Sequence, residues 1–240
     1  MSTIIRKGQE SRQRPESHVC RLLITIDGPA GVGKSTVAKK LAARLGYTYL
    51  DTGALYRGVA WKVRSSNIDP GNSDQVAELL STTKLELAAH EHALSVLVDA
   101  QDVTHELRSL DVSQLASTVA ALPQVRHWLL PIQRNFATEG GIVVEGRDMG
   151  TKVFPEADVK FFLDADPEIR FSRRYRELQT DDQRKNLDDV RREMTLRDDR
   201  DRSRDVSPLI PATDAMMIDT SNLSIDQVLD HLTEVVSARQ

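Results

Sequence analysis

The chain has 240 residues, 40% of them hydrophobic and 28% charged, with a net charge of −4 at pH 7. This length and composition suit one large α/β domain, and the acidic balance argues against a nucleic-acid partner, which normally needs a basic surface. The single cysteine, Cys20, cannot form an internal disulfide, and no apolar run is long enough for a membrane span. We therefore expect a cytoplasmic protein with a disordered polar leader at 1–20 and a domain at 21–240.

An apolar strand, a glycine-rich loop and a helix follow the leader. The strand is predicted at 22–27 and the helix at 34–45, where Gly46 ends it. The loop between them follows the pattern G-x-x-x-x-G-K-S, whose backbone N–H groups cradle the phosphates of ATP. In such a loop Lys34 reaches the outer phosphates and the Ser35 hydroxyl ligates Mg²⁺. The expected ATP-binding residues are Gly28, Pro29, Ala30, Gly31, Val32, Gly33, Lys34, Ser35 and Thr36.

The rest of the chain alternates strands and helices, which is typical of a parallel sheet with helices on both faces. Further strands are predicted at 47–50, 142–145, 159–163 and 215–219. Further helices are predicted at 53–65, 112–121, 124–138, 167–178, 187–203 and 225–238. Between residues 67 and 110 two apolar segments flank a polar one, which predicts a small β-rich insert. We expect His90 and His92 to be exposed hairpin residues there, because two histidines alone do not make a metal site.

A phosphate loop is compatible with three classes of protein: a switch GTPase, a motor or transporter ATPase, and a small-molecule kinase. The GTPase patterns D-x-x-G and N-K-x-D do not occur in the chain, and its length and lack of coiled coil disfavour a motor. A kinase must hold a second phosphate-bearing substrate against the loop, which requires arginines elsewhere in the chain.

Two predicted strands end in segments that supply such arginines. Residues 51–57 place Arg57 on the first turns of a helix, beyond the carboxyl end of a strand, where ligands bind in doubly wound sheets. The second segment is residues 142–150, an apolar strand followed by charged residues. There Glu145 or Asp148 could bind Mg²⁺ through water, and Arg147 could bind a phosphoryl oxygen. The alternative interpretation of both segments is a capped or salt-bridged turn.

The third arginine group is the densest, with eleven arginines between residues 170 and 204. Such a run is most often an exposed helix with interleaved charges. Arg197, Asp201 and Arg204, however, fall on one face of the predicted helix and can point together into a cleft. The polar residues 173–187 predict a mobile lid that brings Arg173 and Arg174 over the phosphates.

Together these segments resemble the bacterial cytidylate kinases, a family of P-loop nucleoside monophosphate kinases. The resemblance covers residues 22 to 235 and rests on ITIDGPAGVGKST, LDTGALYR, VEGRDMGTKVFPEADVKFFLDA and LRDDRDRSRDVSPL. It implies a P-loop kinase fold with a small β insert in the monophosphate-binding region. It also implies transfer of the ATP γ-phosphoryl group to CMP or dCMP, a reaction of pyrimidine nucleotide metabolism.

The resemblance also assigns roles to residues at matching positions. Around the acceptor phosphate it places Thr52, Tyr56, Arg57, Arg147 and Asp148. It places Ser117, Arg126 and Arg204 at the cytosine, and Arg197 and Asp201 at the sugar hydroxyls. The candidate catalytic residues are Lys34, Arg147, Asp148, Arg173 and Arg174. The chain departs from the family where Thr52 stands in place of serine and Glu145 in place of aspartate.

Two other functions remain open on the sequence. The chain could phosphorylate another monophosphate, UMP or AMP, or it could be a regulatory nucleotide-binding module without activity. In each case the expected partners are small molecules, and we expect a monomer. The sequence does not decide between CMP and dCMP.

Overall fold

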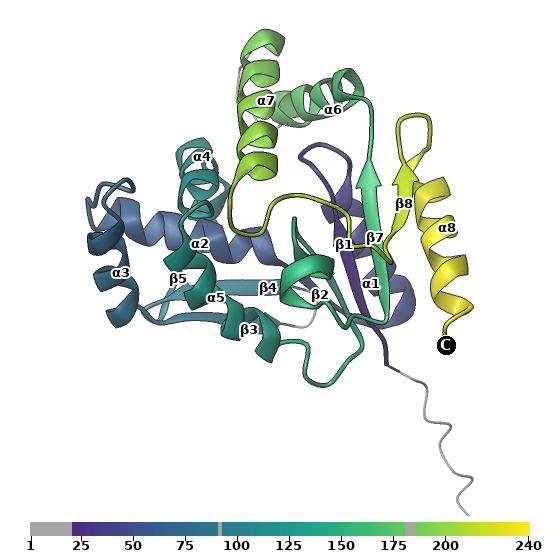
Figure 1. Cartoon of the computed structure of the whole chain (residues 1–240), viewed down its shortest axis with the longest axis horizontal. Coiled ribbons are helices and arrows are strands. Elements are labelled where there is room, and N and C mark those ends of the chain that lie inside the picture. The colour runs from purple at the N-terminus through teal and green to yellow at the C-terminus, as the bar shows by residue number, and fades with distance from the viewer. Residues whose placement is uncertain (1–20, 91–92, 181–185) are drawn as a thin grey trace, which may run out of the picture.

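The computed structural model describes residues 21–90, 93–180 and 186–240, and its centre is a five-stranded parallel sheet (Figure 1). The strand order is β2-β6-β1-β7-β8. The strands are β1 (Leu23–Asp27), β2 (Thr48–Asp51), β6 (Ile142–Glu145), β7 (Val159–Asp164) and β8 (Met216–Asp219). All four neighbouring pairs are parallel, which confirms the predicted α/β class.

Helices cover both faces of this sheet, as predicted. On one face, α1 (Lys34–Leu45) and α8 (Ile225–Ser237) pack their apolar sides against β1, β7 and β8. On the other face, a π-helical turn, Met149–Val153, and the helix α5 (Pro123–Asn135) pack against β6. Because β1 is the central strand, the loop that follows it emerges in the middle of the carboxyl edge.

A second unit lies beside the sheet and has its own apolar core. Its elements are α2 (Thr52–Ser65), α3 (Ser73–Thr82), the antiparallel strands β3 (Leu85–His90), β4 (Ala93–Val98) and β5 (Gln101–Asp102), a 3-10 turn (Glu106–Arg108), and α4 (Leu110–Val119). The sequence predicts β3 and β4 but misses the two-residue strand β5 and the helix α3, in which only Val76 and Leu80 are buried. His92 and the side chain of His90 lie outside the described residues.

The arginine-rich part of the chain forms α6 (Pro167–Thr180) and α7 (Leu187–Ser203), above the carboxyl ends of the strands (Figure 1). A buried ion pair between Arg170 and Asp198 joins the two helices. Arg170 Nη1 also donates to the carbonyl oxygen of Ala30 at 3.1 Å, and the Ala30 N–H donates to Asp198 Oδ1 at 3.5 Å. The pair therefore fixes both helices to the phosphate loop. Residues 181–185 of the expected lid, and the leader with Cys20, lie outside the described residues.

Local signals set several helix ends where the sequence places them. Gly46 ends α1 in the left-handed conformation, with φ of 67°, and Pro167 begins α6. Ser224 and Gln227 form the reciprocal capping box of α8. In the part of the chain that the structure describes, no helix combines the length and the apolarity that a membrane span needs.

The Arg170–Asp198 pair generates a stability prediction. Arg170→Met leaves the Asp198 carboxylate buried without its cation, and we expect the free energy of unfolding to fall by about 3 to 5 kcal/mol. The free energy of unfolding should fall less in the double variant Arg170→Met/Asp198→Leu, because this variant buries no unpaired charge. Urea unfolding measures both variants, with Arg202→Met on the exposed side of α7 as control. Equal losses in the single and the double variant would contradict this account.

Candidate active site

The loop between β1 and α1 has the backbone of a phosphate cradle. Gly28, Gly31 and Gly33 have φ of 146°, 78° and 92°, a region that other residues rarely adopt. A Cβ on Gly28 would lie 2.1 Å from the carbonyl oxygen of Leu163, so the loop also lies close against β7. Gly33 is the N-cap of α1 and offers no side-chain cap, which leaves the first N–H groups of the helix for a ligand.

Lys34 lies inside this loop rather than in solvent. The residue is only 5% exposed, and its ammonium group donates to the carbonyl oxygen of Pro29 at 2.5 Å. Burial and the nearby charge of Arg147 lower the pKa of Lys34, while Glu145 and Asp27 act in the opposite direction. A negatively charged ligand at this position would relieve the repulsion between the lysine and its cationic neighbours.

Carboxylates end two neighbouring strands beside the loop. Asp51 of β2 and Glu145 of β6 are in register, and the buried Glu145 accepts a hydrogen bond from the Tyr49 hydroxyl at 2.6 Å. The Ser35 hydroxyl also interacts with Glu145, and burial together with the charge of Asp51 raises the pKa of the Glu145 carboxyl. A hydroxyl beside two carboxylates is a set of hard oxygen donors, which suits Mg²⁺.

The start of α2 joins this edge to the second unit. Asp51 caps the helix through the Ala54 N–H at 3.2 Å and binds Arg57 through a contact of 2.6 Å. The Thr52 hydroxyl donates to the carbonyl oxygen of Glu145 at 2.7 Å. Arg57 is thus held beside the loop by a carboxylate that a substrate phosphate could replace.

Four arginines, buried or partly buried, and two buried carboxylates form a connected cluster near Lys34. Asp148 accepts a hydrogen bond from Arg126 at 2.5 Å and lies 3.7 Å from Arg204. Asp201 lies 3.1 Å from Arg147, 3.5 Å from Arg204 and 4.0 Å from Arg197. Arg197, Asp201 and Arg204 therefore meet as predicted, although Arg204 is the C-cap of α7 rather than a residue of its last turn.

The cluster contains donors that no protein group satisfies. The Nε atoms of Arg126 and Arg197 and the Nη2 atom of Arg204 are buried in the described structure without a hydrogen-bond acceptor. The guanidinium of Arg126 also lies over the ring of Tyr56, 5.4 Å from its centroid. Buried donors without acceptors are costly, so the cluster is built for a ligand that carries acceptor atoms.

Ser117 of α4 faces the cluster from the second unit. It is 6% exposed, and its hydroxyl accepts a hydrogen bond from Arg200 Nη1 at 2.9 Å. Sequence reasoning missed Arg200, which lies one helical turn from Arg197 on α7 and could have been found by that spacing. Ser117, Arg174, Arg197 and Arg200 line a cavity of about 510 Å³ between α4 and the helices α6 and α7.

The two expected lid arginines have different partners. Arg173 donates to the hydroxyl and to the carbonyl oxygen of Thr220, at 3.0 and 2.6 Å, and the Thr220 hydroxyl contacts the carbonyl oxygen of Val32 in the phosphate loop. Arg174 pairs with Glu177 at 2.8 Å and lines the cavity beside Ser117. Arg173 is therefore linked through Thr220 to the phosphate loop, whereas Arg174 faces the cavity beside Ser117. No motif or spacing in the sequence indicates that Thr220 would join Arg173 to the phosphate loop.

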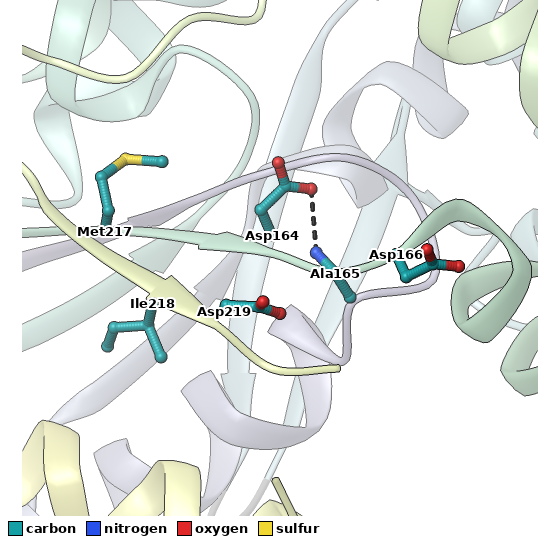
Figure 2. A pocket seen from close by; sticks show the side chains of 6 residues that line it. All are labelled: Asp164, Ala165, Asp166, Met217, Ile218 and Asp219. Carbon is teal, nitrogen blue, oxygen red and sulfur yellow. Dashed lines mark hydrogen bonds between the residues drawn. The ribbon is translucent and has the colours of Figure 1, made fainter. Parts of the chain in front are cut away.

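A separate hollow lies where β7 and β8 end, lined by Asp164, Asp166 and Asp219 (Figure 2). Each carboxylate accepts a nearby backbone N–H: those of Ala165 at 2.9 Å, Glu168 at 2.8 Å and Ser221 at 2.8 Å. Within the described ranges, no three or more His, Cys, Asp or Glu residues are placed to hold a metal ion. The three aspartates therefore cap turns.

Known proteins resemble this chain over most of its length. A cytidylate kinase from Desulfitobacterium hafniense is 46% identical over 211 residues, which cover 88% of this chain and 90% of that protein. A cytidylate kinase from Geobacter sulfurreducens is 43% identical over 219 residues, covering 91% and 94%. The solved structure of an uncharacterized protein from Eubacterium ventriosum has a similar fold, with a TM-score of 0.50 and 15% sequence identity. The match covers 91% of this chain and 99% of that protein's chain. That last likeness concerns the fold alone.

The family model described as cytidylate kinase matches residues 24–238, which include the phosphate loop, the acidic strand ends and the arginine cluster. The chain belongs to the cytidylate kinase family.

Proposed function

We propose that this chain transfers the γ-phosphoryl group of ATP to CMP or dCMP, giving ADP and CDP or dCDP. The observation that carries the proposal is an arginine cluster, with buried donors that have no acceptor, near the phosphate loop that holds Lys34. Burial, together with the charges of Arg147 and Arg197, lowers the pKa of Lys34. The family and its relatives named cytidylate kinase support CMP over the alternatives, UMP, AMP or regulation without catalysis.

On the donor side, the loop holds the ATP phosphates and Lys34 contacts the outer ones. Ser35 would hold Mg²⁺ together with phosphate oxygens, with the Glu145 carboxylate beside it. The bound ion would supply positive charge that neutralises the phosphates during transfer. The hydroxyl of Ser35 and the carboxylate of Glu145 are hard oxygen donors, which fit that ion.

On the acceptor side, we assign the residues of the cluster as the family resemblance implies. Thr52, Tyr56, Arg57, Arg147 and Asp148 surround the acceptor phosphate. Arg197 and Asp201 hold the sugar hydroxyls, and Ser117, Arg126 and Arg204 face the base. The unsatisfied donors of Arg126 and Arg204 support this division, because cytosine presents acceptors at O2 and N3.

The reaction needs no nucleophile from the protein. An oxygen of the CMP phosphate forms a bond to the γ-phosphorus, and the bond from that phosphorus to the β–γ bridging oxygen breaks, so ADP leaves with the electron pair. The cationic side chains of Lys34 and of the arginines stabilise the negative charge that moves between the two phosphates. Helices α6 and α7 lie over this edge, and closing there would exclude water as a competing acceptor.

The base contacts explain a preference for cytosine over uracil. Arginine can only donate hydrogen bonds, whereas uracil carries a donor at N3. Arg200 donates to Ser117, which leaves a second lone pair on that hydroxyl to accept the cytosine amino proton. Uracil would therefore place its N3 donor against the donor groups of Arg126 or Arg204.

Lys34→Ala tests the donor side. The substitution removes the cation fixed in the loop, and we expect kcat to fall roughly a hundredfold or more. Folding should be nearly unchanged, because the lost group is a buried cation with one carbonyl partner. Steady-state rates and thermal unfolding check both points, with Lys39→Ala on the exposed side of α1 as the matched control. A variant with near-normal turnover would overturn the assignment of the loop.

Ser117→Ala tests the base assignment. In the wild type, kcat/KM for CMP should exceed that for UMP by at least about tenfold to a hundredfold. The variant should narrow this gap by lowering kcat/KM for CMP, and the control Ser81→Ala, exposed on α3, should leave the ratio unchanged. Equal use of CMP and UMP by the wild type would refute the cytosine assignment, and an unaltered ratio in the variant would remove Ser117 from the site.

Arg173→Ala and Arg174→Ala test the two lid arginines. We expect each change to lower kcat by a larger factor than it weakens ATP binding, because the arginines act on the closed complex. The comparison needs kcat and the equilibrium dissociation constant for ATP, with Arg176→Ala, exposed on the same helix, as control. Unchanged turnover in both variants would rule out the lid assignment.

A further inference from the structure

Asp27 is a buried carboxylate that none of the roles above uses. It is the last residue of β1, directly before Gly28, and is 4% exposed. Its Oδ1 accepts the Met149 N–H at 2.9 Å and its Oδ2 accepts the Gly150 N–H at 2.7 Å. Both oxygens are therefore committed to the backbone of a segment more than 120 residues away in sequence.

These two N–H groups open the π-helical turn Met149–Val153, of which Asp148 is the N-cap residue. The first N–H groups of a helical turn have no partner within it, and an aspartate at the N-cap normally accepts one of them. Asp148 makes no such bond. Its carboxylate instead contacts Arg126 and Arg204.

We propose that Asp27 is a positioning residue that caps this turn in place of Asp148, and so leaves the Asp148 carboxylate free to hold Arg126 and Arg204 in the base-binding cluster. The proposal rests on the proposed function for what the cluster binds. It adds a physical link from the strand before the ATP loop to the CMP side of the site.

Burial makes this capping necessary. Met149 is 1% exposed and Gly150 is buried, so water cannot readily replace a lost acceptor. The turn also lies close to β1, because a Cβ on Gly150 would lie 3.2 Å from the Thr25 hydroxyl oxygen. Without Asp27, the side chain at the N-cap position, which normally accepts such N–H groups, is that of Asp148. Asp148 would then turn toward its own backbone and leave the two arginines.

The surroundings of Asp27 agree with a carboxylate that acts on the backbone. Burial raises the pKa of Asp27 to about 6, with a smaller contribution from the charge of Asp148, while the Gly150 and Met149 N–H groups and Lys34 favour the charged form. The two hydrogen bonds thus offset part of the cost of burying the charge.

Asp27→Asn is the test, because the amide keeps the shape but offers one acceptor oxygen in place of two. Isothermal titration with CMP alone, without ATP or Mg²⁺, should show CMP affinity weakened by about tenfold. ATP affinity, titrated separately, should change by less than about twofold, because the loop keeps its own contacts. The matched control is Asp158→Asn. That carboxylate accepts the Leu23 N–H at 2.7 Å, at the opposite end of β1, and its loss should leave CMP affinity unchanged.

A double-mutant cycle with Asp148→Asn shows whether Asp27 acts through Asp148. We expect Asp27→Asn/Asp148→Asn to bind CMP about as weakly as Asp148→Asn alone. The proposal would be overturned if the two substitutions weakened CMP affinity additively. It would also be overturned if Asp27→Asn weakened ATP and CMP affinity equally, or left CMP affinity unchanged. If Asp27→Asn does not fold, Asp27→Ser takes its place in the cycle, because the small hydroxyl leaves room for a capping water. Absence of CMP binding by the wild type would instead refute the proposed function.

Discussion

Repulsion between closely spaced arginine side chains is the constraint on which the arrangement of the site depends. Arg126, Arg147 and Arg204 lie together beside the phosphate loop, where low polarity strengthens the interaction between charges. Asp148 and Asp201 hold them apart, and Asp201 alone contacts Arg147, Arg197 and Arg204. Burial raises the pKa of Asp201, but the charges of these arginines outweigh it, and the net effect lowers the pKa. The cluster is therefore organised for an anion before the anion arrives, as electrostatic catalysis requires.

The parallel sheet brings these groups to one edge. Asp27, Asp51 and Glu145 end three adjacent strands, and the phosphate loop leaves the central one. The three carboxylates differ in what they hold, because Asp27 caps a turn, Asp51 caps a helix and binds Arg57, and Glu145 faces Ser35. The Arg170–Asp198 pair then fixes α6 and α7 over this edge by binding Ala30. The same carboxylates and ion pair hold the phosphate loop and the arginine cluster close to each other. As a result, the charges of Arg147 and Arg197 add to burial in lowering the pKa of Lys34.

Local patterns made much of this predictable from sequence. The glycine loop, the apolar strands and the capping box depend on neighbours within a few residues, and the structure has them where the pattern indicates. Helix α3 was missed because its apolar face is only Val76 and Leu80. The contacts of Arg200 with Ser117 and of Arg173 with Thr220 join residues 83 and 47 positions apart, so no local pattern reports them. The same holds for Asp27, whose partners are identified only by tertiary structure.

The central claim is that the arginine cluster accepts CMP as a phosphoryl acceptor. The most direct measurement is the rate of ATP consumption with CMP, dCMP, UMP, AMP and GMP as separate acceptors, at equal concentration and with Mg²⁺ present. The account predicts that CMP or dCMP gives the highest rate, with ADP and the corresponding diphosphate formed in equal amounts. A higher rate with UMP, AMP or GMP, or ATP consumption independent of any monophosphate, would contradict it.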